Sequence, residues 1–360
     1  MRQTLLYDEY RSLGARVVDF HGWALPVQFA GIVHEHLHTR AGASVFDCSH
    51  MGEILIRGRD ALERYDRLVI SDVLALKVGR GRYGAILNEH GGIVDDVITI
   101  KLAEDEVLVV CNAATLPVVA GLIAADNPGV ENVSDATAKI DVQGPASRDV
   151  LNALGVAAAA GLRYFQACRT QWQGEEIVLT RMGYTGELGF ELYVPNQLAV
   201  PLWRSLVSVE GVEPAGLGAR DTLRLEMGYP LSGQDFDESH TPLEARQEAF
   251  VAWDTVFTGK EALLAQRAVG RYPVLTAIRT SDRRAPRHGY SVFDSDPQDD
   301  DTPVGAVTSG TFGPSVGHGI GLAYLPRDHV CPGTKLRVGP RQLAVETVEL
   351  PFYQHGTCRA

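Results

Sequence analysis

Apolar residues recur along this chain with two different periods, and their distribution predicts its elements. Up to residue 245, segments with apolar residues every three or four positions are interspersed with short alternating segments, which indicates helices mixed with strands. The predicted helices cover residues 3–13, 32–41, 60–69, 114–125, 147–154, 197–209 and 219–227. The predicted strands include residues 17–20, 26–29, 53–57, 85–88, 93–101, 107–111, 139–142, 175–180 and 190–194.

The region after residue 245 differs from the rest of the chain. Short β-rich segments at 273–279, 304–309 and 335–338 are separated by Gly and Pro. Residues 294–301 carry five Asp in eight positions, which is typical of a solvated loop. The chain contains no long linker and no internal repeat. The pattern therefore predicts an α+β fold followed by a mostly β C-terminal domain.

Composition and charge exclude several classes of partner. The 360 residues are 45% hydrophobic and 22% charged, which is the balance of a globular protein with more than one domain. The net charge is −12, and the 33 Lys and Arg form no basic run. Because nucleic acids and anionic membranes bind clustered basic residues, neither is an expected partner. A small anionic ligand needs only a local basic cluster and stays possible.

The compartment is predicted to be the cytoplasm. Residues 1–10 lack the apolar stretch of a signal peptide, and the longest apolar segments, such as 118–125, are too short to cross a bilayer. Five cysteines without a Cys-x-x-Cys pair suit a reducing compartment.

Three short motifs have a functional and a structural interpretation. Residues 34–38, His-Glu-His-Leu-His, have the spacing of a zinc-hydrolase helix, but no third ligand is recognisable, so a polar helix face is favoured. Residues 79–84 fit Gly-x-Gly-x-x-Gly, but a strand is predicted after them, where a dinucleotide site needs a helix. Gly216 and Gly218 precede a helix and serve either an anion or close packing.

Acidic residues inside predicted strands are more informative. Asp95 and Asp96 follow a Gly-Gly turn, and strand alternation places one inward and the other outward. Burying an unpaired carboxylate is costly, so such an Asp is either a turn cap or a functional acid. Glu191 lies between Phe190 and Leu192 and faces away from both, in a segment whose alternative interpretation is a surface hairpin.

In their order and spacing, these segments resemble the aminomethyltransferase family. The resemblance runs from about residue 4 to residue 353, and no single motif is specific alone. The matching segments are residues 13–23, 46–53, 88–96, 143–145, 183–191, 215–226, 233–235, 259–263 and 307–312. Together they identify the chain as a member of that family.

The resemblance implies three domains around a central folate-binding opening. Residues 1–50 and 138–243 would form a discontinuous α+β domain, and residues 51–137 an inserted α+β domain. Residues 244–360 would form a β-rich domain, barrel-like or jelly-roll-like.

The resemblance also implies tetrahydrofolate as the cofactor and requires no metal. Asp96 would be the catalytic carboxylate beside the reacting folate nitrogens, where it stabilises positive charge and relays a proton. Glu191 would pair with the amino and ring N–H edge of the pterin. Five further residues match positions of the family's folate pocket: Tyr83, Asn112, Tyr184, Arg220 and Tyr229.

The implied reaction moves an aminomethyl group from the lipoyl arm of a carrier, the H-protein, to tetrahydrofolate with release of ammonia. The sequence departs from the family pattern at Ser71, Leu188, Asp254, His318 and Gln354. These departures leave two alternatives: a folate-dependent demethylase of a small O-, N- or S-methyl compound, and a non-catalytic folate-binding protein. The sequence predicts no oligomeric state.

Overall fold

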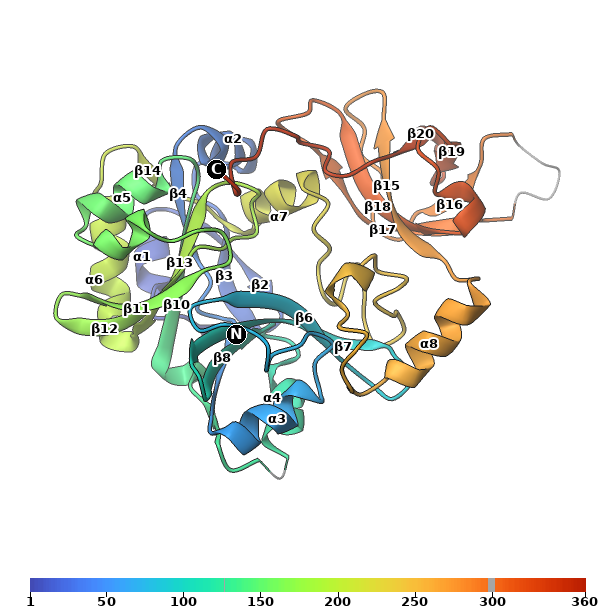
Figure 1. The fold of residues 1–360 in the computed structure, drawn as a ribbon. Coiled ribbons are helices and arrows are strands. Elements are labelled where there is room, and N and C mark those ends of the chain that lie inside the picture. Colours follow the sequence, from blue (N-terminus) through green and yellow to red (C-terminus); the bar gives the residue numbers. More distant parts are fainter. Residues whose placement is uncertain (126, 297–301) are drawn as a thin grey trace. The chain divides into compact units, whose positions relative to one another are not determined.

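The computed structural model describes residues 1–125, 127–296 and 302–360, and the chain forms two compact units (Figure 1). Unit 1 comprises Met1–Ile86, Asp95–Asp221 and Gly356–Ala360, and unit 2 comprises Leu87–Val94 and Thr222–His355. The three-domain division expected from the family stays a prediction. Most of the acidic loop expected at 294–301 lies outside the described residues.

Three sheets contain the strands that precede residue 215. The six-stranded sheet has the order β11 (Ala167–Trp172), β12 (Glu175–Thr180), β13 (Gly189–Pro195), β10 (Thr137–Gln143), β4 (Ala43–Asp47), β14 (Val212–Pro214). The five-stranded sheet has the order β6 (Gly81–Leu87), β7 (Ile93–Ala103), β8 (Glu106–Cys111), β5 (Gly52–Arg57), β9 (Val130–Asn132). The three-stranded sheet has the order β1 (Arg2–Gln3), β3 (Trp23–Gln28), β2 (Arg16–Phe20).

The helices are short and lie mostly between these strands in the sequence. They are α1 (Tyr7–Ser12), α2 (Ile32–Ala41), α3 (Arg59–Asp66), α4 (Leu116–Ala124), α5 (Ser147–Ala153), α6 (Asn196–Val207), α7 (Leu217–Glu226) and α8 (Lys260–Val269). Single 3₁₀ turns occur at Ser134–Ala136, Ala157–Ala160, Glu248–Phe250 and Arg327–His329.

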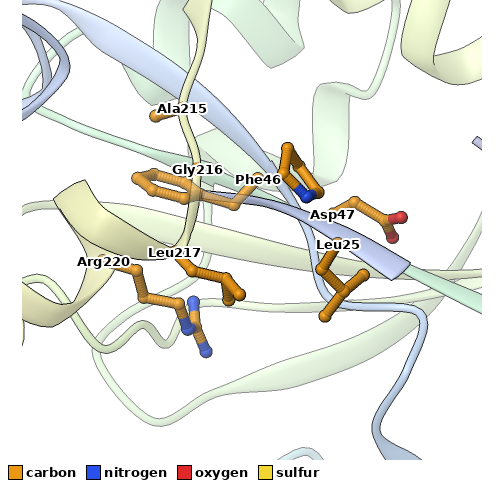
Figure 2. A pocket seen from close by; sticks show the side chains of 8 residues that line it. Leu25, Phe46, Asp47, Ala215, Gly216, Leu217 and Arg220 are labelled. Atoms are coloured by element: carbon orange, nitrogen blue, oxygen red, sulfur yellow. The ribbon is translucent and has the colours of Figure 1, made fainter. Parts of the chain in front are cut away.

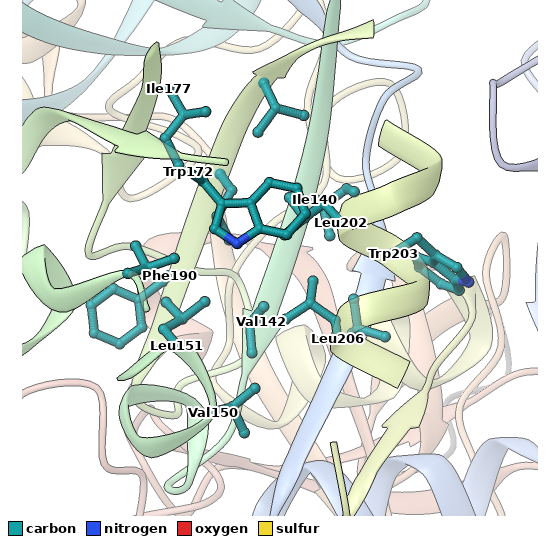
Figure 3. Close-up of a cluster of buried hydrophobic side chains, with 14 of the residues drawn as sticks. Ile140, Val142, Val150, Leu151, Trp172, Ile177, Phe190, Leu202, Trp203 and Leu206 are labelled. Atoms are coloured by element: carbon teal, nitrogen blue, oxygen red, sulfur yellow. The ribbon is translucent and has the colours of Figure 1, made fainter. Parts of the chain in front are cut away.

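The two faces of the six-stranded sheet have different chemistry, because strand side chains alternate between them. On one face, Ile140 and Val142 of β10 pack with Leu202 and Leu206 of α6 in the main core of unit 1, which Figure 3 shows. Phe190 of β13 belongs to the same core. The opposite face of β10 and β13 carries the polar residues described below.

That opposite face meets the five-stranded sheet in a second apolar cluster, here called the inter-sheet layer. It consists of Leu55, Ile100, Leu108, Val110, Ala167, Met182 and Tyr193, with Ile98 and Val178 at its margin. Since both sheets belong to unit 1, functional residues on the two facing surfaces share one interior.

Unit 2 is built on a closed barrel. Its strands follow the order β15 (Val274–Thr280), β18 (Gly319–Leu325), β17 (Gly305–Phe312), β16 (Ser291–Asp294), β19 (Lys335–Val338), β20 (Leu343–Val348). Ile278, Val292 and Val307 are among its buried core residues. The predicted α+β fold with a β-rich, barrel-like C-terminal domain is confirmed.

Several local features differ from the predictions: β4 and α8, for example, were not expected, and two further differences have a physical reason. The helix expected over 3–13 is limited to Tyr7–Ser12, because the hydroxyl of Thr4 donates to Asp47 at 2.7 Å and fixes the preceding residues in another conformation. Strand β11 was not predicted, since its exposed positions are polar and it lies at the edge of its sheet. Among the described residues, no helix has both the length and the apolarity that a bilayer span requires.

Candidate active site

Asp95 and Asp96 at the start of β7 are joined by one amide. The Asn112 side chain donates to Asp95 Oδ1 at 2.8 Å and to Asp96 Oδ1 at 2.7 Å, and its backbone N–H donates to Asp95 Oδ2 at 2.9 Å. Asp95 is fully buried, whereas Asp96 keeps partial exposure. The two residues lie on opposite faces of β7, but the carboxylate expected to face outward is intermediate in burial rather than exposed, and Asp95 orients Asn112 toward Asp96.

Asp96 has an unusual protonation equilibrium. Burial and the neighbouring charge of Asp95 raise its pKa to about 7, although hydrogen bonds from Asn112 and Tyr83 oppose the rise. A pKa near neutrality suits a group that both gives and takes protons.

Four charged side chains form a second cluster on β10, β13 and α7, here called the unit 1 charge cluster. The Lys139 ammonium lies 2.8 Å from Asp141 Oδ1 and 3.2 Å from Glu191 Oε1, and the Arg220 guanidinium lies 3.1 Å from Asp141 Oδ2. The Tyr193 hydroxyl donates to Glu191 Oε2 at 2.7 Å. Two cations therefore balance two carboxylates.

The charges in this cluster stabilise one another. Burial opposes the charge on Lys139, but Asp141 and Glu191 outweigh it and raise the pKa of Lys139. Burial likewise opposes ionisation of Asp141, yet Lys139 and Arg220 hold its pKa below the usual range. The Asp141 carboxylate is consequently ionised.

Tyr184 connects the two groups of residues. Its ring lies 5.3 Å from the Arg220 guanidinium carbon, and its hydroxyl is one of the groups that raise the pKa of Tyr83, after burial and Asp96. The turn that carries Tyr184 wraps around Gln143. A Cβ on Gly183 or Gly189 would lie 2.0 Å from Gln143 Oε1, so both positions require glycine.

The structure brings together six of the seven predicted site residues within unit 1: Asp96, Tyr83, Asn112, Tyr184, Glu191 and Arg220. Tyr229 belongs to unit 2, where its carbonyl accepts from Arg224 at 3.0 Å. Arg220 also lines a small pocket with Leu25, Phe46 and Asp47, shown in Figure 2.

Lys139, Asp141 and Glu53 are site residues that the sequence reasoning missed. Glu53 lies on β5, is 0% exposed, and neither of its carboxyl oxygens has a hydrogen-bond partner among the described residues. The available signal was a charged residue inside an apolar strand, as in Lys139-Ile140-Asp141-Val142 and Glu53-Ile54-Leu55-Ile56.

The remaining motifs have structural roles. Glu35 is buried rather than part of a polar face, and it accepts from the backbone N–H groups of Phe29, Gly31 and Gly216. A strand and not a helix accompanies the glycines of residues 79–84, as predicted, but β6 begins at Gly81, within the glycine segment and before the expected residue 85. Gly218 packs so closely on Ile32 that a Cβ would lie 2.5 Å from it, which supports close packing. Within the described ranges, no three acidic, His or Cys residues are placed to hold a metal.

The departures from the family pattern lie in different environments. Leu188 is buried in the main core of unit 1, and Ser71 is buried with an unpartnered hydroxyl. Asp254 and Gln354 are exposed in unit 2, and His318 is partly buried there.

Comparison with known proteins agrees with this architecture. The GCVT N-terminal domain family matches residues 6–255, and the glycine cleavage T-protein C-terminal barrel domain family matches residues 274–354. The aminomethyltransferase of Saccharopolyspora erythraea is 42% identical and that of Halothermothrix orenii 39% identical; the alignments cover 98% of this chain in both cases and 98% and 100% of those chains. The crystal structure of the glycine cleavage system aminomethyltransferase T from Bartonella henselae matches with a TM-score of 0.92 and 32% identity, over 99% of both chains.

These matches define an enzyme that transfers a one-carbon group. The chain belongs to the glycine cleavage T-protein family of aminomethyltransferases, so the predicted family and enzyme class are confirmed.

Proposed function

We propose that the chain takes the aminomethyl group from the lipoyl arm of an H-protein and transfers its carbon to tetrahydrofolate, with release of ammonia and formation of 5,10-methylene-tetrahydrofolate. One observation carries the proposal. A carboxyl with a pKa near neutrality, Asp96, and a carboxylate that contacts Lys139, Glu191, face the same interior of unit 1. The relatives are named aminomethyltransferases, which supports an aminomethyl group as the group that is transferred.

The residues of unit 1 fit a reduced pterin. The Glu191 carboxylate lies 3.2 Å from the Lys139 ammonium, and a carboxylate accepts hydrogen bonds from the amino and ring N–H groups of a pterin edge. Tyr184 offers an aromatic face beside Arg220. The unpartnered oxygens of Glu53 provide further buried hydrogen-bonding capacity.

Tetrahydrofolate, when bound, supplies two amine nitrogens that accept the carbon. Asp96 is proposed to take up and return the protons that these nitrogens and the leaving amine exchange, and its negative charge stabilises positive charge on the transferred carbon. Asn112 and Tyr83 hold the carboxyl in one orientation through hydrogen bonds. The apolar inter-sheet layer keeps water away from the reacting groups.

The proposal includes a cytoplasmic location. All five cysteines are unpaired, and Cys48 and Cys111 are buried thiols, as expected in a reducing compartment.

A product assay tests this function. The protein is mixed anaerobically with tetrahydrofolate and an aminomethyl-loaded lipoyl H-protein, and ammonia and 5,10-methylene-tetrahydrofolate are measured. Stoichiometric formation of both is the expected result. Folate binding without either product would contradict the proposed donor, and formation of 5-methyl-tetrahydrofolate from a small methyl compound would establish the demethylase instead.

A further inference from the structure

Glu53 is a buried acid whose position is fixed although its carboxyl group has no partner. Its backbone N–H donates to the Ser134 hydroxyl at 2.8 Å, and its carbonyl accepts from Val133 N–H at 2.9 Å. These bonds fix the strand, so the direction of the side chain is set by the pleat of β5. Buried polar groups normally find partners, and a carboxyl with two unpartnered oxygens calls for a functional explanation.

The strand register shows which way Glu53 faces. Glu53 pairs with Val110, and Val110 pairs on its other side with Ile98, so all three lie on one face of the five-stranded sheet. Asp96, two residues before Ile98 on β7, lies on this face as well. Leu55 and Val110 place the face in the inter-sheet layer, against Tyr193 of β13.

Glu53 therefore shares the inter-sheet layer with both Asp96 and Glu191. Cross-strand pairing of β10 with β13 puts Asp141 opposite Glu191 and Lys139 opposite Tyr193. These four residues therefore lie on the same face of the six-stranded sheet. Glu53 interacts electrostatically with residues of the six-stranded sheet as well as with residues of its own five-stranded sheet. Its titratable and charged neighbours are Lys139, Glu191, Asp47, Cys111 and Tyr193.

The charge balance leaves Glu53 without a counterion. Lys139 is its cationic neighbour, and Lys139 already contacts both Asp141 and Glu191. Burial raises the pKa of Glu53 well above its usual range, and Lys139 offsets this only in part. Because the Lys139 ammonium is already engaged by Asp141 and Glu191, burial favours the neutral form of Glu53, a carboxylic acid with one O–H donor and one carbonyl acceptor.

We propose that Glu53 is a further folate-binding residue of this site, and that it binds the pterin as a neutral acid through one donated and one accepted hydrogen bond. The inference rests on the proposed function. A carboxylate paired with a cation, as Glu191 is with Lys139, matches an edge with two donors, whereas a neutral acid matches an edge with a donor beside an acceptor. The pterin ring has edges of both kinds, so the two acids contact different edges.

Glutamine distinguishes the two acids, because its amide also has one donor face and one acceptor face. Tetrahydrofolate affinity is measured anaerobically by calorimetry for the wild type, Glu53→Gln, Glu53→Leu and Glu191→Gln. Glu53→Gln should bind within about threefold of the wild type, while Glu53→Leu and Glu191→Gln should each bind at least roughly tenfold more weakly. The exposed Glu131→Gln is the matched control and should leave affinity unchanged.

The outcomes separate this inference from the proposed function. Wild-type affinity in Glu53→Leu would overturn the role of Glu53 and leave the function intact. Equal losses in Glu53→Gln and Glu53→Leu would show that Glu53 acts as an ionised group, which contradicts the inference. Absence of tetrahydrofolate binding by the wild type would overturn both proposals.

An infrared difference spectrum covers the case in which Glu53→Leu does not fold. When tetrahydrofolate is added to the wild type, a C=O stretch of a protonated carboxyl should shift, and this band should be missing in Glu53→Gln but present in Asp96→Asn, which removes the other acid with a raised pKa. A wild-type spectrum without such a shift would overturn the inference.

Discussion

Two buried charge clusters, one in each compact unit, differ in the unpartnered group in their surroundings, which in the part of the chain that the structure describes is the Glu53 carboxyl in unit 1 and the Tyr324 hydroxyl in unit 2. In unit 2, Asp235 accepts from Arg224 at 2.7 Å, from Leu231 N–H at 2.9 Å and from the hydroxyl of Thr308. Arg224 also donates to Ser309 at 2.9 Å. Among the described residues, none of these side chains has a buried polar atom without a partner.

The unit 1 charge cluster is balanced in charge, but an acid beside it is not satisfied. Among the described residues, neither carboxyl oxygen of Glu53 has a hydrogen-bond partner, and Nδ1 of the buried His50 has none either. An unpartnered buried carboxyl group costs more free energy than an unpartnered hydroxyl such as that of Tyr324 in unit 2. Glu53 is therefore the stronger candidate to contact a polar ligand.

The largest expected effect comes from Asp96→Asn. The amide keeps the size and hydrogen-bonding reach of the acid but cannot exchange the proton, so turnover should fall by about 10²–10⁴-fold. Folate affinity, measured by calorimetry, should change little. The exposed Asp105→Asn is the control, and near-normal turnover in Asp96→Asn would remove its catalytic assignment.

Breaking the Arg224–Asp235 ion pair of the unit 2 cluster should lower the stability of the fold rather than turnover. Arg224→Met leaves Asp235 buried without its cation, which is expected to lower the free energy of unfolding by roughly 3–5 kcal/mol. Lys139→Met should cost less stability, because Arg220 still pairs with Asp141 and Tyr193 with Glu191, but should weaken folate binding. Urea unfolding and calorimetry of both variants measure this, and equal stability losses would contradict the distinction.

The pH dependence of turnover should report Asp96. Its pKa of about 7 means that the ionised form increases as pH rises through neutrality. Under the proposed role, kcat/KM should therefore rise through pH 7 and level off above it. A flat profile through this range would count against Asp96 as the proton-exchanging group.

The smallest effect expected concerns stability. Because the folded-state pKa of Asp96 lies above its unfolded value near 4, the folded protein binds more protons between these values, and stability falls as pH rises from about 4 to about 7. Asp96→Asn should thus unfold at a higher temperature than the wild type at pH 8, and the difference should vanish near pH 4. Equal unfolding temperatures of the variant and the wild type at pH 8 as well as at pH 4 would contradict a raised pKa of Asp96 in the folded protein.

The sequence predicted those features that depend on local periodicity. The opposite orientations of Asp95 and Asp96, and of Glu191 relative to Phe190, follow from alternation within one strand. The choice of Asp96 over Asp95 came from the family resemblance.

Features that depend on strand pairing could not be predicted from local patterns. Lys139 meets Glu191 only because β10 pairs with β13, and Glu53 reaches their surroundings only because two sheets pack face to face. The residues around Glu53 do not indicate which strand or sheet it would face. The sequence therefore shows a charged residue within a strand but not its neighbours in space.

Folate is proposed to bind in the interior of unit 1, beside the unpartnered carboxyl group of Glu53. A crystal structure with tetrahydrofolate bound tests it most directly. The pterin is expected to lie within hydrogen-bonding distance of Glu191 and Glu53, with its reactive nitrogens beside Asp96. A pterin that contacts none of these three carboxyl groups would contradict the account.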